Sequence, residues 1–496
     1  MKAYQQYQQK LQKVADIEHA IAVLSWDQET YLPAKGANQR SQQITTLAGI
    51  LHETATDTQM GDLLGTLKDD MSLNEWERCN ITKSYDDYVR QSKFTTDFVM
   101  RQSKAIADAY HAWMHARETN SFAVFAPDLD TIVQLKRETC DIVGYTEHPY
   151  DALLNEYEPK GRTVVITRLF ESVRQQMVDF VREIAAQPQV DDSFMYKHYN
   201  KDRQWQLGLT LLKQMGYDFE AGRQDLSTHP FTTSFGSQDV RVTTRVAEND
   251  FNEMIWSCLH EGGHALYEQG LNPNYYGLPT GKATSLGIHE SQSRLWENNV
   301  GRSLPYWKAN YALTQQMFPE NLASVSLDGF YKAMNKVQPS FIRTSADELT
   351  YHFHILIRFE IEKGLIEGTM ATKDLAEIWN AKYKEYLGID VPNDKMGVLQ
   401  DIHWSHGSLG YFPTYSLGSF YAAQFFAKAT KDIPNLESQI EQGNMSNLLT
   451  WLRTNIHQYG MLYTSEELCE RVTGEPLNFD YFMTYARQKY GHIYSL

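Results

Sequence analysis

Cysteine is scarce in this sequence, with four residues among 496. The cysteines lie far apart and form no C-x-x-C pair, which argues against a disulfide-rich secreted domain. The first twenty residues are polar and charged and contain no apolar segment of the length of a signal peptide. These two absences predict a cytoplasmic protein in which Cys79, Cys140, Cys258 and Cys469 are reduced and mostly buried.

Long apolar runs and an excess of basic residues are also missing. The most apolar stretches, residues 20–26 and 355–361, are far too short to cross a bilayer, so we expect no membrane partner. The 62 acidic residues outnumber the 46 basic ones and give a formal charge of −16. This is the wrong sign for a general nucleic-acid-binding surface, and it suits a soluble protein.

Proline is infrequent, at 15 of 496 residues, and long segments contain neither proline nor a cluster of turn residues. Residues 4–24 place apolar side chains three and four positions apart, which is the period of an amphipathic helix. Residues 100–118, 165–186 and 415–431 have similar patterns, whereas residues 187–193 are a loop candidate. Because the chain shows no repeat and no obvious linker, we expect a mainly α protein.

Residues 229–246 interrupt the helical pattern. The stretches 231–235 and 240–246 are rich in Thr, Val and Phe, and residues 236–239 between them have turn chemistry. This arrangement predicts a β-hairpin in an otherwise helical protein. It immediately precedes the strongest motif in the chain, so we expect the hairpin to belong to the same site.

That motif is H-E-x-x-H, formed by His260-Glu261-Gly262-Gly263-His264. Residues four apart lie on one face of a helix, so both imidazoles can reach a single tetrahedral Zn²⁺. Glu261 would then lie near the open metal position, where it can accept a proton from water. The motif alone also arises by chance, so a purely structural helix is the alternative.

The surroundings of the motif predict a helix. Apolar residues between 251 and 266 recur at helical spacing, Asp250 followed by Glu253 resembles a capping box, and Gly270 suits a C-terminal cap. A glycine inside a helix costs about 1 kcal/mol relative to alanine. The pair Gly262 and Gly263 therefore suggests that another element or a substrate comes close to this helix.

Two histidines do not complete a catalytic zinc site, which usually has three protein ligands. A polar string at residues 288–294 follows a segment, residues 270–287, whose glycine and proline allow an antiparallel return. Either His289 or Glu290 could supply the third ligand on chemical grounds. A solvated helix terminus is the alternative interpretation of this string.

Taken together, these motifs resemble those of the carboxypeptidase Taq family of metallocarboxypeptidases, and the resemblance covers nearly the whole chain. Besides H-E-G-G-H, the matching motifs are Trp26-Asp27 with Pro33, Gly36 and Arg40, His229-Pro230-Phe231, D-x-R-x-T at 239–243, His289-Glu290-Ser291-Gln292, I-R-x-x-A-D at 342–347 and G-x-x-Q-D-x-H-W at 397–404. All of them in this order are far more specific than H-E-x-x-H alone.

The resemblance implies a large, mainly α, clam- or saddle-shaped fold with a deep groove, related to neurolysin-like peptidases. To this the residue pattern adds a small β-hairpin or sheet beside the metal site. We expect one domain over residues 1–496, with a helical N-terminal region at about 1–120 and a catalytic core at about 220–430. The resemblance also implies a homodimer that removes single residues from peptide C-termini with broad specificity.

The zinc ligands of the family fall on His260, His264 and Glu290, and its general base falls on Glu261. The resemblance therefore favours Glu290 over His289 as the third ligand. We expect one Zn²⁺ per chain. Because Co²⁺ accepts similar ligands, it could substitute.

Peptide hydrolysis also needs a hydrogen-bond donor, besides the metal, for the developing oxyanion. Residues 401–415 are rich in donors and glycine, and related clam-shaped peptidases use a His and a Tyr separated by a few residues in this region. We expect Tyr411 first and Tyr415 second in this role, with His403 or His406 nearby. The alternative is an aromatic core with hydrogen-bonded histidines.

An exopeptidase must recognise the free α-carboxylate of its substrate, and Arg343 is the best candidate. Ser345 and Glu348 resemble a capping box that begins a helix running to about Gly364, so Arg343 would precede a helix N-terminus that favours anions. A guanidinium adds a bidentate, permanently charged partner. The alternative is an ion pair with Asp347.

Arg241 belongs to the predicted hairpin, which could offer backbone groups to an extended peptide substrate. Arg241 and Arg245 could instead brace the hairpin.

Two other functions are possible: a zinc oligo-endopeptidase of the same fold, which would not require a free C-terminus, and an inactive helical peptide-binding protein. The intact Glu261 and the three ligand positions argue against the inactive protein.

Overall fold

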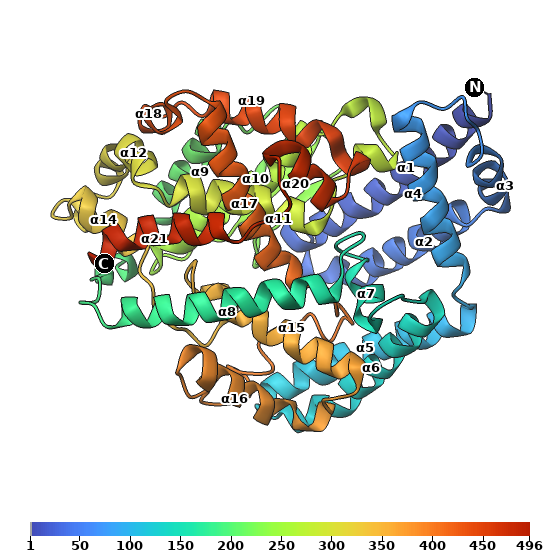
Figure 1. Cartoon of the computed structure of the whole chain (residues 1–496), viewed down its shortest axis with the longest axis horizontal. Helices are drawn as coiled ribbons and strands as arrows, with labels where there is room; N and C mark the ends of the chain where they lie inside the picture. Colours follow the sequence, from blue (N-terminus) through green and yellow to red (C-terminus); the bar gives the residue numbers. More distant parts are fainter. Residues whose placement is uncertain (1) are drawn as a thin grey trace. The chain divides into compact units, whose positions relative to one another are not determined.

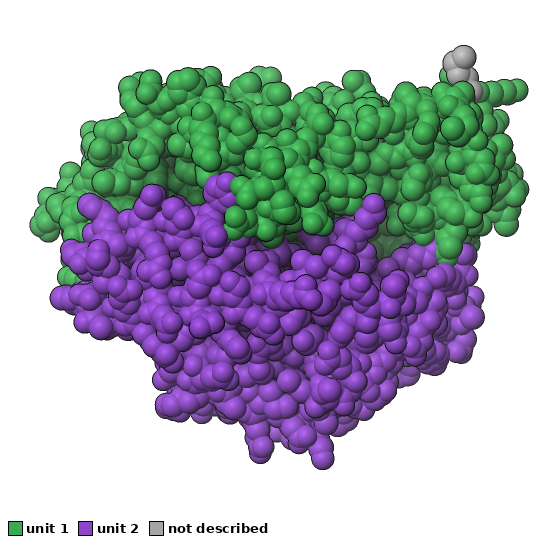
Figure 2. Space-filling view, viewed as in Figure 1, with its two compact units in different colours: residues 1–89, 191–334, 421–478 green, residues 90–190, 335–420, 479–496 purple. Residues whose placement is uncertain are grey.

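The computed structural model describes residues 2–496 and consists mainly of helices (Figure 1). The chain forms two compact units, each assembled from three segments (Figure 2). Unit 1 comprises residues up to 89, 191–334 and 421–478, and unit 2 comprises residues 90–190, 335–420 and 479–496. The expectation of one domain over the whole chain stays a prediction.

The helices of unit 1 form three groups along the chain. In order, they are α1 (Lys2–Thr30), α2 (Ala37–Ala55), α3 (Thr58–Leu67), most of α4 (Glu75–Ser92), α9 (Lys201–Met215), α10 (Phe251–Gly270), α11 (Leu286–Arg294), α12 (Leu304–Met317), α13 (Pro319–Leu322), α14 (Leu327–Met334), the second part of α17 (Pro413–Asp432), α18 (Leu436–Glu441), α19 (Ser446–Asn455) and α20 (Ser465–Thr473). Short 3₁₀ pieces and one π-helix join them: η1 (Ala34–Gly36), η2 (Ser193–Tyr196), η3 (Pro273–Tyr275), η4 (Pro279–Gly281), the π-helix η5 (Leu295–Gly301) and η8 (His457–Leu462).

Unit 2 is built around a central helix, α15. Its helices are α5 (Thr96–Thr119), α6 (Phe122–Val143), α7 (Pro149–Leu154), α8 (Thr163–Ala185), η6 (Arg343–Ser345), α15 (Tyr351–Glu367), η7 (Thr372–Asp374), α16 (Leu375–Leu387), the first part of α17 and α21 (Asp480–Tyr494). The four helices expected from periodicity correspond to α1, α5, α8 and α17.

A small three-stranded sheet lies in unit 1, with strand order β1-β3-β2. The expected hairpin is confirmed as β2 (Thr232–Ser234) antiparallel to β3 (Val240–Thr244), although both strands are shorter than the pattern suggested. Its partner β1 (Gln224–Leu226) runs parallel to β3 and was not expected, because three residues carry no readable period. Both β2 and β3 pack against α10, which carries the H-E-x-x-H motif.

Helix α10 begins as expected but ends differently. The side chain of Asp250 accepts a hydrogen bond from the backbone N–H of Asn252, whereas Glu253 pairs with Arg245 at 2.9 Å instead of completing a capping box. Gly270 is the last helical residue rather than the cap. A Cβ at this position would lie 2.4 Å from Nδ1 of His457, so the glycine is needed for close packing.

The two glycines inside the motif allow neighbouring helices to approach α10. A Cβ on Gly262 would lie 2.7 Å from a methyl group of Leu212 on α9. A Cβ on Gly263 would lie 2.6 Å from Cα of Ser293 on α11, a contact that real Cβ atoms do not make. The expected close approach therefore comes from two flanking helices, and α11 is the helix that carries Glu290.

Helix α15 is buried on almost every side, its polar residues His352, His354, Arg358 and Glu362 included, and it packs against α6, α7, α8 and α16 of unit 2. A helix of this kind is stable only in a protein interior. It begins at Tyr351, so the expected start near Ser345 is wrong. The reason is Asp347, whose carboxylate accepts the backbone N–H groups of Leu349 and Thr350 at 2.9 Å each and holds the chain in a turn.

The mainly α fold with a small β element beside the motif helix is confirmed. The clam shape and the deep groove stay predictions. Among the described helices, none combines the length and the hydropathy that a bilayer-spanning segment needs.

Candidate metal centre

Three side chains of unit 1 converge on one point. The Nε2 atoms of His260 and His264 lie 3.6 and 3.4 Å from Oε2 of Glu290, and the ligand atoms of all three residues lie within 4.8 Å of one another. Within residues 2–496, this is the one cluster of three or more His, Cys, Asp or Glu side chains with such geometry. Helix α10 contributes both histidines and α11 contributes the carboxylate.

These distances fit a metal ion. Ligand atoms that bind one Zn²⁺ at 2.0–2.1 Å in a tetrahedron are about 3.3 Å apart. The two distances to Glu290 are close to this value, and two imidazoles with one carboxylate are a known donor set of catalytic zinc. Three protein ligands also leave one tetrahedral position for water or substrate.

The structure separates the two candidates for the third ligand. His289 turns toward α10, where its Nε2 lies 2.9 Å from Oε1 of Glu268. Its ring stacks on that of His264, with the ring centroids 4.4 Å apart. Glu290 therefore belongs to the candidate metal site, whereas His289 stacks on the ring of His264 and does not belong to it.

Glu297 is a residue of this centre that sequence reasoning missed. Its Oε2 lies 2.8 Å from Nδ1 of His260, and its other oxygen accepts a hydrogen bond from Arg302 at 3.1 Å. Glu297 belongs to the π-helix that continues α11, a rare form that often marks functional sites. Its position seven residues after Glu290 was the available signal, since two helical turns return to the same face.

Arg294 places a positive charge beside the carboxylates of Glu290 and Glu297. Its Nε donates to Oε1 of Glu290 at 2.7 Å, and its NH1 donates to Glu297 at 3.1 Å. Burial raises the pKa of Glu290, but Arg294 and His260 lower it more, so the net pKa lies well below its ordinary value. Glu290 is therefore ionised and ready to bind a cation.

The two histidines have different electrostatic surroundings. Burial and the neighbouring His289 lower the pKa of His264 to about 3, so this imidazole is neutral, the form that binds metal. Burial also lowers the pKa of His260, but Glu290 and Glu297 outweigh it and raise the net pKa above the ordinary value. The two carboxylates thus give His260 a surrounding that favours positive charge.

Glu261, the expected general base, is 8% exposed. Its Oε2 accepts a hydrogen bond of 2.7 Å from the hydroxyl of Thr232 on β2, and the same hydroxyl contacts its backbone oxygen at 2.9 Å. Burial raises the pKa of Glu261 above its ordinary value. The small sheet therefore fixes the carboxylate, while burial increases its affinity for a proton.

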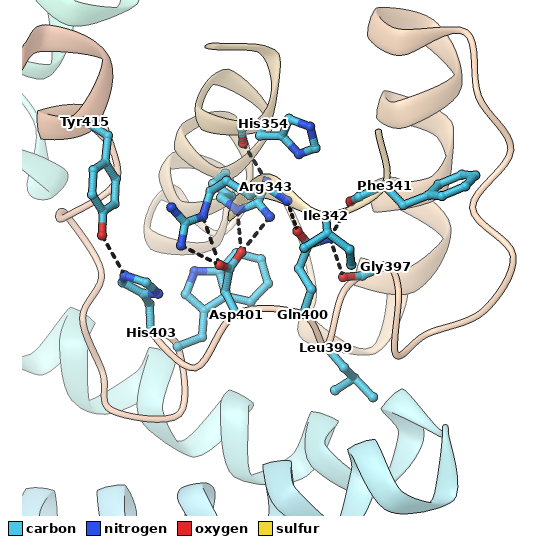
Figure 3. A network of polar contacts seen from close by, with 12 residues as sticks. Phe341, Ile342, Arg343, His354, Gly397, Leu399, Gln400, Asp401, His403 and Tyr415 are labelled. Carbon is cyan, nitrogen blue, oxygen red and sulfur yellow. Dashed lines mark hydrogen bonds and ion pairs between the residues drawn. The ribbon is translucent and has the colours of Figure 1, made fainter. Parts of the chain in front are cut away.

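A second polar cluster lies in unit 2, around Asp401 (Figure 3). Arg343 donates from Nε to Oδ1 of Asp401 at 3.0 Å and from NH1 to Tyr351 at 3.1 Å. Arg358, which is fully buried, donates from Nε to Oδ2 of Asp401 at 2.6 Å. The expected alternative, an ion pair between Arg343 and Asp347, is not what the structure shows.

Gln400 ties two of the sequence motifs together in this cluster (Figure 3). Its Oε1 accepts the backbone N–H of Arg343 at 2.8 Å, and its Nε2 donates to the carbonyl of Phe341 at 3.0 Å. The I-R-x-x-A-D segment and the G-x-x-Q-D-x-H-W segment are therefore in direct contact. This contact holds Arg343, which is 7% exposed, in a fixed orientation.

The expected oxyanion donors are also in unit 2. The hydroxyl of Tyr415 lies 3.2 Å from Nε2 of His403, as Figure 3 shows. The ring of Tyr411 lies 5.1 Å from that of Tyr415 and 5.4 Å from that of His403, so these three form one group. His406 is exposed and its ring packs against Tyr110 of α5 instead.

Arg241 on β3 braces the hairpin. Its guanidinium forms a bidentate ion pair with Asp239 at 2.8 and 2.9 Å. It also lies over the rings of Trp26 and Phe235, at 4.5 and 4.9 Å from their centroids. These contacts favour the bracing role over a role in substrate binding.

Comparison with known proteins gives matches along the whole chain. A model of the carboxypeptidase Taq (M32) metallopeptidase family matches residues 6–490. The chain is 38% identical over 514 residues to thermostable carboxypeptidase 1 of Thermus thermophilus, covering 99% of each protein. It is 36% identical over 494 residues to carboxypeptidase 1 of Bacillus subtilis, covering 98% of this chain and 97% of that one.

Among solved structures, the M32 carboxypeptidase of Deinococcus radiodurans R1 superposes with a TM-score of 0.98 at 38% identity, and the match covers 100% of both chains. These matches agree with the resemblance inferred from the motifs.

Proposed function

Because the chain belongs to the carboxypeptidase Taq (M32) metallopeptidase family, a family of peptide hydrolases, we propose that it is a zinc-dependent carboxypeptidase that releases single residues from peptide C-termini with broad specificity. The observation that carries the metal assignment is the convergence of His260, His264 and Glu290 at tetrahedral spacing. One such cluster among the described residues supports one metal per chain, and its donor set would also accept Co²⁺.

His260, His264 and Glu290 would hold a Zn²⁺, which would supply Lewis acidity for the attack of water on the peptide carbonyl. Glu261 acts as general base and acid: it accepts the proton of the attacking water and returns it to the leaving amine. Its raised pKa supports this cycle, because a carboxylate that binds a proton more tightly is the better base. Thr232 holds the carboxylate in one orientation.

Tyr411 donates a hydrogen bond to the developing oxyanion, with Tyr415 as the second candidate. His403 supports them through its contact with the hydroxyl of Tyr415. The exposure of His406 and its packing against Tyr110 give it the weakest support in this group.

Arg343 binds the terminal carboxylate of the substrate. The charge of its cluster supports this role: two guanidinium groups share the single carboxylate of Asp401, which leaves one net positive charge. Burial together with Arg358 and Arg343 lowers the pKa of His354 well below its ordinary value, so that neighbour is neutral. A buried excess of positive charge favours an anionic ligand.

We further propose that the enzyme is a homodimer, as the family resemblance implies, and that it is cytoplasmic. The cysteines support a reducing compartment, since none of the four takes part in a disulfide in the described part of the chain. Of the substrate-binding residues expected, Arg241 has less support than Arg343, because its ion pair with Asp239 is neutral, whereas Arg343 and Arg358 together outnumber Asp401.

The proposed activity is tested with one peptide in two forms, a free acid and a C-terminal amide, and the products are identified by mass spectrometry. A carboxypeptidase releases one residue from the acid and cuts the amide much more slowly. Internal cleavage, or equal rates for both forms, would support the oligo-endopeptidase of the same fold. Removal of metal by a chelator should abolish activity, and Zn²⁺ or Co²⁺ should restore it. Full activity in a sample shown to be metal-free would contradict the proposal.

A further inference from the structure

Glu362 is a buried carboxylate whose hydrogen bonds all come from neutral donors. It belongs to α15 in unit 2 and is fully buried. Its Oε1 accepts the indole N–H of Trp404 at 2.8 Å, and its Oε2 accepts the hydroxyl of Tyr150 at 2.6 Å and the backbone N–H of Gly410 at 2.9 Å. The neighbouring cation, Arg358, is ion-paired with Asp401.

The donors to Glu362 mark the two ends of one loop. Trp404 directly follows His403, and Gly410 directly precedes Tyr411. A single carboxylate therefore holds the chain beside Tyr411, the first candidate for the oxyanion donor, and beside His403, which supports the donors in the proposed function. Residues 403–411 are called the donor loop below.

The loop is fitted closely against α7 at the same place. Gly410 has a φ of +99°, and a Cβ there would lie 2.7 Å from the backbone carbon of Leu153. A left-handed conformation and this close approach together require glycine. Tyr150, the third donor to Glu362, is also on α7, so Glu362 connects the loop to the helix that it packs on.

A bare carboxylate is expensive to bury, and hydrogen bonds must offset the lost hydration. Burial raises the pKa of Glu362 to about 7, because three hydrogen bonds from neutral groups do not fully replace water. If this position served only to fill the protein interior, an apolar side chain would cost less free energy to bury than a carboxylate. What the carboxylate adds is the ability to accept from the indole, the hydroxyl and the backbone N–H at once.

We propose that Glu362 is a positioning residue that holds the donor loop in its working conformation and so sets the places of His403 and Tyr411. The inference rests on the proposed function, which gives these two residues their roles. Glu362 itself does not touch substrate or metal in this proposal.

The informative variant is Glu362→Gln. Glutamine has the same size, but its amide replaces one accepting oxygen by a donor, so it cannot serve both Trp404 and the pair Tyr150 and Gly410. We expect kcat to fall at least about 10-fold, as for a lost buried hydrogen bond, with KM changed less than about 2-fold. Metal content should not change, and hydrogen exchange in residues 403–411 should become faster.

The matched control is Glu360→Gln on the same helix. Glu360 contacts Lys382 and Tyr386 rather than the donor loop, so this variant should keep both the kinetics and the exchange of the wild type. If Glu362→Gln does not fold, Tyr150→Phe removes a single donor and should give the same effects at smaller size.

Double variants separate positioning from a general loss of structure. If Glu362 acts through Tyr411 or His403, combining Glu362→Gln with Tyr411→Phe or His403→Gln should cost less than the product of the two separate losses. Full multiplication with both partners, or unchanged exchange and kcat in Glu362→Gln, overturns the proposal. If instead Tyr411→Phe and His403→Gln alone leave kcat unchanged, the proposed roles of the loop fail, and hydrogen exchange still decides whether Glu362 holds it.

Discussion

Nδ1 of His260 lies 2.8 Å from Oε2 of Glu297, on the side of the ring opposite to Glu290. This contact fixes the orientation of the imidazole, so its Nε2 faces the proposed metal position. Carboxylates that hold a ligating histidine in this way commonly tune its basicity and its affinity for metal.

We therefore predict that Glu297→Gln lowers the affinity for Zn²⁺ by about 10- to 100-fold, the usual effect of removing such a partner. The measurement is a competition titration with a chromophoric chelator. Glu253→Gln is the matched control, because Glu253 is on the same helix as His260 but pairs with Arg245. Equal affinities for wild type and Glu297→Gln would show that this contact does not support metal binding.

Glu297 differs from the H-E-x-x-H residues in how well its role could be predicted from the sequence. The H-E-x-x-H helix could be predicted because spacing of four residues determines which side chains share a face. The glycine pair could be interpreted because glycine inside a helix needs a reason, and the backbone of α11 supplies it. For Glu297 the spacing of seven residues from Glu290 was a weak signal, because its partner His260 is 37 residues away and the π-helix that carries it cannot be recognised from spacing.

The surroundings of Arg343 were harder to predict for the same reason. Its partner Asp401 lies 58 residues further along the chain, whereas Asp347, the partner weighed from sequence, is close by. Local spacing also suggested a helix start at Ser345, but the side chain of Asp347 binds backbone N–H groups and delays the helix to Tyr351. Long-range ion pairs and side-chain turns are decided by packing, which one sequence does not reveal.

The general base gives a second prediction. Glu261→Gln keeps the shape of the side chain but cannot accept a proton, so kcat should fall by at least about 10²-fold. Folding and metal content should be normal. Steady-state kinetics on metal-saturated enzyme checks this. Thr232→Val, which removes only the hydrogen bond to Glu261, is the comparison variant, and its kcat should fall less than that of Glu261→Gln. A kcat near that of the wild type in Glu261→Gln would remove Glu261 from the mechanism.

The third prediction concerns acid stability. Burial, opposed by Asp401 and reinforced by Arg343 and Arg358, lowers the pKa of His403 to about 4 from an ordinary value of 6.5. The folded protein thus keeps His403 neutral where the unfolded chain protonates it. The resulting stabilisation is complete above pH 6.5 and is lost as pH falls from 6.5 to 4, by at most about 1.4 kcal/mol per pH unit.

The free energy of unfolding, measured by denaturant at pH 7 and pH 5, should therefore fall more steeply in the wild type than in His403→Gln. His115→Gln, at an exposed position of α5, is the control and should follow the wild type. The same pH dependence in all three proteins would mean that His403 is not held neutral by the fold.

The last prediction tests how the free C-terminus is recognised. The guanidinium of Arg343 is buried and already contacts Asp401 and Tyr351, so a substrate carboxylate must share it. Sharing is favourable because Arg358 also neutralises Asp401 and leaves one positive charge in the cluster. Arg343→Ala removes that excess charge and leaves a neutral pair. Arg343→Lys keeps the charge but cannot bind a carboxylate in a bidentate manner. Its kcat/KM for a free-acid peptide should therefore lie between those of the wild type and Arg343→Ala.

The experiment is a cycle in which one change is made in the protein and the other in the substrate. We expect Arg343→Ala to lower kcat/KM for the free-acid peptide by about 10²-fold, the effect of a charge-assisted bidentate contact, and to change hydrolysis of the amidated peptide little. The two losses should therefore not multiply, because both remove the same contact. If the wild type prefers the acid and Arg343→Ala retains the whole preference, the carboxypeptidase activity stands but the carboxylate binds elsewhere. In that case Arg241 is the next residue to test, since its pairing with Asp239 is partly exposed and a substrate could displace it.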